Sequence, residues 1–416
     1  MYLRSKSRAW LAKLFYRKVS LEKKSMTTVG IICECNPMHG GHEYLIRRAK
    51  EGRDVRVLCV MSGCFVQRGE AAIAEPYLRA EALVRAGADA VVELPFPYAA
   101  SGAEFFGAAG VEILSRLGAD EIWFGSECGD MELLKRAAEV CESENFQALY
   151  AQSAADNSGT AEAYFDILQR LCGEGTPLLS NDILGIAYLR AIQKTNAKLR
   201  AMTVKREGSA YSEQNLNADG FPSATALRKA WRERGVKSIL PLLPNACCDV
   251  YARAEYPIDL ANAERLILGH LRLTDPTKLE QIAELSGGLG SRLQRVACKS
   301  ESLGELIELS ATKKYPTARL RRGIVFALTG ITPKLLRTSP AFVRLLAATR
   351  EGCRLLAEIR KTSNLPVVTR KSDLPDTPEA KTQAELERRA WALYGLCRPD
   401  ATLFPSPWKR SPVILE

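Results

Sequence analysis

Short apolar runs alternate with amphipathic segments along the first third of the chain. The apolar runs predict four buried strands, at Val29–Cys33, Val55–Met61, Ala90–Leu94 and Ile122–Phe124. Helical spacing between them predicts three helices, at His39–Lys50, Pro76–Ala86 and Gly102–Leu117. Strands that alternate with helices in this way indicate an α/β fold with a doubly wound parallel sheet.

A polar or turn-rich stretch follows each predicted strand. The four stretches are Asn36–His42, Ser62–Glu70, Pro95–Ser101 and Gly125–Asp130. In a doubly wound sheet, ligands bind outside the carboxyl ends of the strands. We therefore expect the four stretches to converge on one binding site.

The pattern becomes mainly helical after residue 130. We expect a loop at Asp156–Thr160, a helix that starts with Ser180 or Asn181 as its cap and runs to about Gln193, and a late strand at Arg200–Lys205. The segment Gly208–Pro222 is turn-rich, and Ser223 opens another helix. Beyond Arg228 the pattern predicts amphipathic helices with little strand. These features divide the chain into an α/β domain at 27–235 and a mainly helical, basic domain at 236–416.

Residues 1–26 form a basic leader that contains eight Lys or Arg and one Glu, and they end at a second methionine, Met26. The leader lacks the apolar core and small-residue cleavage site of a secretory signal. We expect either a start codon that was assigned too early or a disordered leader.

Composition favours a globular protein of the cytoplasm. Of the 416 residues, 46% are hydrophobic and 25% are charged, and no apolar run reaches the length of a membrane span. The twelve cysteines include no CxxC pair, so we expect reduced thiols. Only Glu34 and Cys35 lie near the paired histidines, so we expect no zinc and no dedicated metal site.

The net charge of +10 is unevenly distributed: residues 27–226 sum to −9 and residues 227–416 to +12. Between Leu309 and Arg350 there are nine basic residues and no acidic one. The nine are Lys313, Lys314, Arg319, Arg321, Arg322, Lys334, Arg337, Arg344 and Arg350, and Tyr315, Phe326 and Phe342 are interleaved with them. Basic helices track phosphates and aromatic rings stack on bases, so this block favours an RNA surface over merely solvated helix faces.

Two of the three histidines lie together in His39-Gly40-Gly41-His42, directly after the first strand and its turn. At this spacing both rings fall on one face of the first helical turn. The unpaired N–H groups of a helix start favour anions, and the two glycines permit a close approach. This arrangement suits in-line attack on the α-phosphate of a nucleotide, which needs charge stabilisation more than covalent help.

The stretch Asn36-Pro-Met-His-Gly-Gly-His42 resembles the His-x-Gly-His signature of the nucleotidyltransferase superfamily. Six ordered segments resemble one branch of it, the bacterial tRNA(Met) cytidine acetate ligases. They are Glu34–His42, Val60–Glu70, Val92–Pro95, Phe124–Glu127, Ser180–Gly185 and Val204–Tyr211. The resemblance implies that residues 27–235 form an ATP-binding catalytic domain and that residues 236–416 bind tRNA.

The resemblance also implies the site residues. His39 and His42 are the expected catalytic residues. The expected nucleotide contacts are Ile32, Cys33, Glu34, Cys35, Asn36, Pro37, Met38, His39, Gly40, Gly41, His42, Glu43, Tyr44, Leu45, Gly125, Asn181 and Arg206.

For several further polar residues, the sequence allows both a ligand-binding and a structural interpretation. Ser223, Thr225 and Arg228 resemble a second phosphate motif, and alone they read as a helix cap with a surface arginine. Arg206 is favoured over Lys205 because a guanidinium grips phosphate bidentately. Arg68 is left open between an acetate or phosphate ligand and a surface residue, and Glu34 between holding Mg²⁺ through water and orienting a histidine.

The expected activity is ATP-dependent formation of acetyl-adenylate, with Mg²⁺ on the phosphates. The acetyl group is then expected to pass to N4 of the wobble cytidine of elongator tRNA(Met). Two alternatives stay open: an adenylyltransferase that joins ATP to a phosphorylated cofactor precursor, and a non-catalytic nucleotide- or RNA-binding protein. The sequence does not indicate an oligomeric state.

Overall fold

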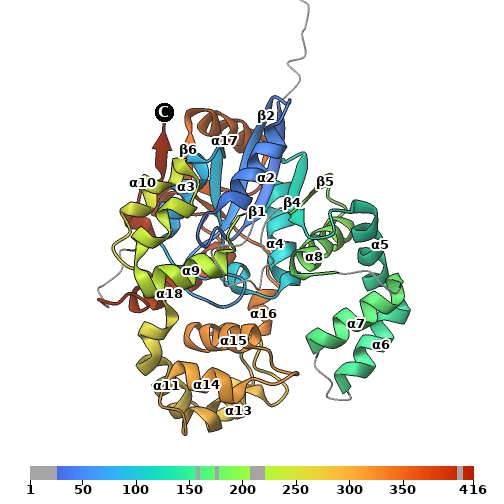
Figure 1. Ribbon diagram of the computed structural model, residues 1–416, viewed down its shortest axis with the longest axis vertical. Coiled ribbons are helices and arrows are strands. Elements are labelled where there is room, and N and C mark those ends of the chain that lie inside the picture. The colour runs from blue at the N-terminus through green and yellow to red at the C-terminus, as the bar shows by residue number, and fades with distance from the viewer. Residues whose placement is uncertain (1–25, 156–159, 174–177, 207–220, 401–405) are drawn as a thin grey trace, which may run out of the picture.

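The computed structural model describes residues 26–155, 160–173, 178–206, 221–400 and 406–416 (Figure 1). Within these residues one eight-stranded sheet has the order β5-β4-β1-β2-β3-β6-β7, and β8 pairs with β6. The strands are β1 (Thr27–Cys33), β2 (Val55–Ser62), β3 (Ala90–Leu94), β4 (Glu121–Ser126), β5 (Arg200–Lys205), β6 (Val343–Thr349), β7 (Val367–Val368) and β8 (Val413–Leu415). Strands β5, β4, β1, β2 and β3 are mutually parallel, and β6 runs antiparallel to β3. The chain moves from β1 to β2 and β3 on one side and later to β4 and β5 on the other, so the topological switch point lies between β1 and β4.

Helices cover both faces of the sheet. Those of the first half are α2 (Gly40–Lys50), α3 (Pro76–Arg85), α4 (Ala103–Arg116), α5 (Met131–Glu142), α6 (Glu144–Ala155), α7 (Thr160–Cys172) and α8 (Ser180–Thr195). Those of the second half are α9 (Ala224–Arg234), α10 (Asn245–Ala252), α11 (Glu264–Leu273), α12 (Pro276–Leu279), α13 (Leu289–Ala297), α14 (Leu303–Ser310), α15 (Thr317–Thr329), α16 (Pro333–Leu336), α17 (Arg350–Thr362) and α18 (Pro378–Leu396). Six short 3₁₀ turns lie within the described part of the chain, at 98–100, 236–238, 240–242, 260–263, 371–373 and 407–409.

Each face of the sheet has its own core. One core joins the sheet to α2, α3 and the helices α9–α15 and α18, and the other joins it to α4, α5, α8 and α17. Helices α11, α13, α14 and α15 gather at one end of the molecule, below the sheet in Figure 1. No helix among the described residues is long and apolar enough to cross a membrane.

The doubly wound, mostly parallel sheet predicted from the sequence is confirmed, as are the late strand β5 and the helix that Ser223 opens. Strand β4 is longer than predicted, because the carboxylate of Glu121 at its start is buried and accepts a hydrogen bond from Trp123 Nε1 at 2.7 Å. A charged residue is therefore accommodated where the apolar pattern alone ends. The predicted loops at 156–160 and 208–222 fall largely outside the described residues.

The prediction of little strand beyond Arg228 is wrong in the last quarter of the chain, where β6, β7 and β8 join the sheet. The run Val343-Arg-Leu-Leu-Ala-Ala-Thr349 is short and apolar, so its pattern does not distinguish a buried strand from a helix. The division near residue 235 stays a prediction, but the residues after it do not all lie outside the sheet.

Arg344 of β6 lies at the centre of a buried charge cluster. Its guanidinium donates to Glu93 of β3 and to Glu387 of α18, and all three side chains are almost fully buried. Gln383 donates to the second oxygen of Glu387 at 2.9 Å. The cluster therefore joins β3 to two elements from the last quarter of the chain.

Candidate active site

The two histidines of the signature form a reciprocal cap at the start of α2. Nδ1 of His39, the N-cap residue, accepts the N–H of Gly41 at 3.1 Å, and Nδ1 of His42 accepts the N–H of His39 at 3.3 Å. The ring centroids lie 4.0 Å apart. Because both Nδ1 atoms act as acceptors, each neutral ring carries its hydrogen on Nε2. The site therefore presents two Nε2–H donors side by side.

Both imidazoles are held neutral. Burial lowers the pKa of His39 well below its ordinary value, and the neighbouring His42, Arg206 and Arg228 lower it further. Burial and the charge of Arg206 lower the pKa of His42 to about 4. At neutral pH the pair thus donates hydrogen bonds without carrying charge, and the nearby arginines supply the positive field.

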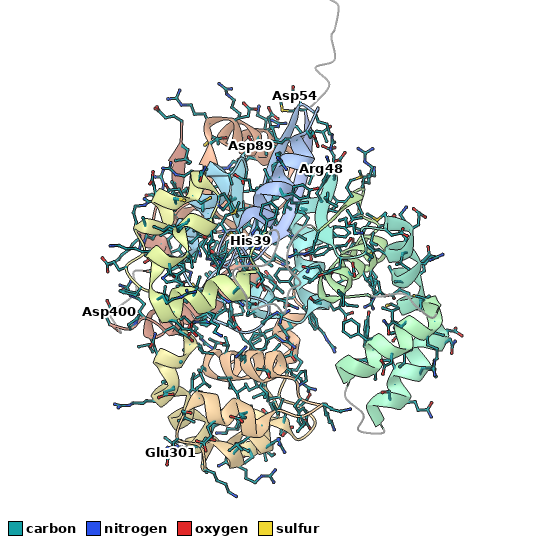
Figure 2. All side chains as sticks on the ribbon, viewed as in Figure 1. His39, Arg48, Asp54, Asp89, Glu301 and Asp400 are labelled. Atoms are coloured by element: carbon teal, nitrogen blue, oxygen red, sulfur yellow. The ribbon has the colours of Figure 1, made fainter. Side chains whose placement is uncertain are left out.

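The histidines line a cavity of about 510 Å³ at the carboxyl ends of the strands. Figure 2 shows His39 near the middle of the molecule. The walls include residues from α2, from the ends of β1, β4 and β5, from α8 and from the start of α9. The cavity therefore spans the switch point between β1 and β4, where ligands of such sheets bind.

Most residues expected to contact the nucleotide line this cavity. They are Ile32, Cys33, Glu34, Cys35, Asn36, His39, Gly41, His42, Tyr44, Leu45, Gly125, Asn181 and Arg206. Four expected residues do not line it: Pro37, Met38, Gly40 and Glu43. Met38 is buried in the core, where its N–H donates to the hydroxyl of Tyr251 at 2.8 Å.

The two glycines of the signature make room for rings within the protein. A Cβ added at Gly40 would lie 2.1 Å from the ring of Phe221, which lines the cavity. A Cβ added at Gly41 would lie 2.9 Å from the ring of His39. Gly40 itself does not line the cavity, and its expected contact with the nucleotide stays a prediction.

The motif at Ser223 combines a helix cap with a buried arginine. Ser223 lines the cavity and caps α9 by accepting the N–H of Ala226 at 3.1 Å. Arg228, also buried, donates to the carbonyl of Asn36 at 2.9 Å and to Thr225 Oγ1 at 3.3 Å. The prediction that Ser223 caps a helix is confirmed. The prediction that Arg228 lies on the surface is wrong, because its buried guanidinium holds the backbone at Asn36, three residues before His39. A phosphate role for the motif stays a prediction.

Asn181 lies at the start of α8, but neither it nor Ser180 is the cap residue. Leu179 occupies the N-cap position, and the Asp182 carboxylate accepts its N–H at 2.8 Å. Glu127 accepts the backbone N–H of Asn181 at 3.0 Å and also its side-chain amide N–H. The amide oxygen and the second amide N–H of Asn181 are therefore left to contact a ligand.

Arg206 and Gly125 lie against each other on the β4–β5 side. The N–H of Arg206 donates to the carbonyl of Ser126 at 2.9 Å, and a Cβ at Gly125 would lie 3.1 Å from Arg206 Cγ. Glycine at this position therefore lets the arginine stem cross the strand and reach the cavity, which Lys205 also lines.

Sequence reasoning missed Arg79, which organises the strand ends beneath the site. This fully buried guanidinium donates to the carbonyls of Glu34 at 2.7 Å, Ser62 at 3.0 Å and Ala74 at 2.9 Å, and also to Gly63. It thereby ties the ends of β1 and β2 together. In the sequence it is an ordinary helix arginine three residues after Pro76.

The sequence also gave no signal for the wall formed by the second half. Pro316, Ala318 and Arg322, at the start of α15, line the cavity together with Phe165 of α7. A Cβ at Gly69, in the loop after β2, would lie 2.3 Å from the backbone nitrogen of Arg322. The loop and α15 are thus in direct backbone contact.

The basic block at 309–350 is not an unbroken RNA surface. Phe326 and Phe342 are fully buried and Tyr315 nearly so, which leaves these rings no face for a base. Five of the nine cations form ion pairs with acidic residues distant in sequence: Arg319 and Arg322 with Glu284, Arg321 with Glu70, Arg344 with Glu93 and Glu387, and Arg350 with Glu416. The absence of local acidic residues was therefore a misleading signal.

Comparison with known proteins first defines the class of protein to which the chain belongs. The family model of the HIGH nucleotidyl transferases matches residues 26–404, nearly the whole described chain. The chain is 34% identical over 385 residues to the tRNA(Met) cytidine acetate ligase of Caldanaerobacter subterraneus subsp. tengcongensis, covering 89% of this chain and 95% of that one. It is 31% identical over 397 residues to the enzyme of the same name from Acetivibrio thermocellus, with coverage of 89% and 95%.

Two crystal structures of Thermotoga maritima TmcAL have the same fold. The apo form superposes with a TM-score of 0.86 and the form bound with alpha-thio ATP with a TM-score of 0.85. Each is 28% identical and covers 94% of this chain and 100% of its own. The chain belongs to the tRNA(Met) cytidine acetate ligase family, which confirms the resemblance drawn from the motifs.

Proposed function

We propose that this protein uses ATP to activate acetate as acetyl-adenylate and then acetylates N4 of the wobble cytidine of elongator tRNA(Met), giving N4-acetylcytidine. The observation that carries the proposal is the pair of neutral imidazoles with adjacent Nε2–H donors on a cavity at the switch point. The names of the relatives, and the neighbour bound with alpha-thio ATP, support ATP as the nucleotide and the tRNA as the acceptor.

In the first half-reaction an acetate oxygen attacks the α-phosphorus and pyrophosphate leaves. Negative charge develops on the phosphoryl oxygens, and the Nε2–H groups of His39 and His42 are the donors that would stabilise it. Arg206, beside them, is suited to hold phosphate oxygens bidentately. The chain thus supplies positioning and electrostatic stabilisation, which is what phosphoryl chemistry requires.

The residues present do not build a cage for Mg²⁺. The described part of the chain contains no group of three or more His, Cys, Asp or Glu side chains that could hold a metal ion. Glu34, the one acidic side chain among the described residues that line the cavity, already accepts the N–H of Gln67 at 2.9 Å. Any Mg²⁺ would therefore arrive with the triphosphate, where it would neutralise phosphate charge.

In the second half-reaction the cytidine amine attacks the acyl carbon and AMP leaves. An acyl-phosphate anhydride also reacts with water, so the cavity must hold it away from solvent. The wall from α15 suits this purpose, because it brings part of the second half of the chain against the strand ends.

Exchange of labelled pyrophosphate into ATP tests this function against its alternatives. We expect exchange that depends on acetate and occurs without tRNA, followed by acetyl transfer to tRNA(Met). Exchange that depends on a phosphorylated precursor such as phosphopantetheine would instead support a cofactor adenylyltransferase. ATP binding with no exchange under any condition would support a non-catalytic binding protein.

We also propose that exposed cations around α16 contribute to the tRNA surface. Lys334 and Arg337 are exposed, and neither forms an ion pair with any residue of the described part. Replacing both with Glu is expected to weaken tRNA binding and to lower the slope of log K against log salt by about 1 for each lost phosphate contact. The measurement is the tRNA dissociation constant across a salt series.

Arg350→Glu is the matched control, because Arg350 belongs to the same basic block but starts α17, which lies at the top of Figure 1, whereas α16 lies below the sheet. It should leave the salt slope unchanged. An equal loss in the control and in the double variant would place the RNA surface elsewhere.

A further inference from the structure

The second half-reaction needs a proton acceptor. When the exocyclic amine of cytidine attacks the acyl carbon, its nitrogen lone pair forms the C–N bond. The C–O bond to the phosphate breaks, its electron pair leaves with AMP, and one N–H proton must leave the nitrogen. Because the lone pair is delocalised into the ring, this amine is a weak nucleophile, and removal of the proton during attack assists the reaction.

The cavity offers few groups able to take that proton. His39 and His42 use Nδ1 to accept backbone N–H groups and carry hydrogen on Nε2, so neither ring has a lone pair left. Burial raises the pKa of Cys35, and the hydrogen bond with Cys59 together with burial raises that of Cys33, which keeps both lining thiols protonated at neutral pH. Among the described lining residues this leaves Glu34 as the single carboxylate.

The carboxylate of Glu34 is partly engaged and partly available. One oxygen accepts the N–H of Gln67 at 2.9 Å, and the other has no hydrogen-bond partner within the described residues. The backbone of Glu34 is fixed by Arg79, which donates to its carbonyl at 2.7 Å. Glu34 is thus a rigidly positioned acceptor at the end of β1, five residues before the catalytic pair.

We propose that Glu34 is the general base of the acyl-transfer half-reaction, taking the N4 proton of the acceptor cytosine and passing it to solvent. This inference rests on the proposed function, and it assigns to Glu34 a role that the adenylation half-reaction does not require.

Charged groups on α9 and on the loop after β2 affect the titration of Glu34. Burial raises the pKa of Glu34, and the negative charge of Glu70 in the loop after β2 raises it further. The positive charges of Arg228 on α9 and Arg68 in that loop, and the hydrogen bond from the N–H of Gln67, lower it by less, so the pKa stays above its ordinary value. His39 and His42 of α2 share the cavity but are neutral. The carboxylate is the active form, so transfer is expected to slow as pH falls through a pKa above the ordinary carboxyl value.

The test measures the two half-reactions separately in the full-length protein. Transfer is followed in single turnovers from chemically prepared acetyl-adenylate to tRNA(Met) between pH 5 and 8, and adenylation by acetate-dependent pyrophosphate exchange. Glu34→Gln keeps an oxygen for the Gln67 N–H but cannot take a proton. We expect the rate of transfer in this variant to fall about 100-fold more than the rate of exchange. We also expect the decrease of the transfer rate at low pH, the acid limb of the pH profile, to disappear.

Glu70→Gln is the matched control, because it removes a charge from the same cluster without lining the cavity. It should not separate the two half-reactions. Glu34→Asp retains a carboxylate and should keep the acid limb, which gives a readout even if Glu34→Gln proves unstable in thermal unfolding. Equal losses in both half-reactions for Glu34→Gln, a persistent acid limb in that variant, or a missing limb in Glu34→Asp would each overturn the role of Glu34. No acetate-dependent exchange by the unaltered protein would instead overturn the proposed function.

Discussion

Replacing His39 with alanine is expected to reduce acetate-dependent pyrophosphate exchange by about 10²–10³-fold, the usual cost of removing one donor to a developing oxyanion. The variant loses an Nε2–H donor next to that of His42. tRNA binding should stay nearly intact, because no part of this change touches the exposed cations of the second half. Exchange kinetics and a tRNA binding curve on the same preparation measure both effects. An equal loss of both would contradict the proposed division of labour.

His39 is also the N-cap of α2, so alanine changes two things at once. Asparagine separates them, because it is a good N-cap that lacks the imidazole donor. We expect His39→Asn to exchange as poorly as His39→Ala while recovering about 1 kcal/mol of the stability that the lost cap costs. Exchange restored by asparagine would show that His39 acts on the reaction only by starting the helix.

Replacing Arg344 with methionine is expected to lower the free energy of unfolding by about 3–5 kcal/mol. The change leaves the carboxylates of Glu93 and Glu387 buried without their shared cation. Chemical denaturation followed by circular dichroism measures the loss. A variant with all three residues made apolar, Glu93→Leu, Arg344→Met and Glu387→Leu, should recover much of it, since whole buried ion clusters are often replaceable.

Arg350→Met provides the comparison for this experiment. Arg350 directly follows β6 and pairs with Glu416, but the side chains are 70% and 91% exposed. Exposed pairs contribute little to stability, so this variant should unfold like the unaltered protein. A similar loss in both methionine variants would mean that burial of the Arg344 cluster is not what stabilises this edge of the sheet.

The first half of the fold was predictable because its strands are buried on both faces and its helices alternate with them. Each such strand reads as a bounded apolar run, as in β3, where the predicted and observed limits agree at Ala90 and Leu94. β6 has the same kind of run, but a run of this length fits a buried helix as well as a strand, and its Arg344 is compensated by two carboxylates from distant parts of the chain. A local pattern cannot contain that information, so the strand was missed.

The same reasoning explains the candidate site. The His42 ring accepts the N–H of His39 and the His39 ring accepts the N–H of Gly41, so the geometry is contained within four residues of sequence. Arg79 acts on carbonyls from both strand ends, and Arg322 reaches the cavity from the second half, so only the fold brings them to the site. The basic block misleads for the same reason. Its nine cations have no acidic residue nearby in sequence, but five of them pair in the fold with acidic residues from distant parts of the chain.

The backbone contact between Gly69 and α15 has a consequence for how such a protein can evolve. A side chain at position 69 would collide with main-chain atoms of the helix, and the positive φ of 72° at this residue also favours glycine. The two halves of the chain are therefore not interchangeable modules. A new segment grafted after the sheet would have to reproduce the part of α15 that lines the cavity and packs against Gly69. Changes of substrate should therefore arise by altering side chains on this scaffold rather than by exchanging parts.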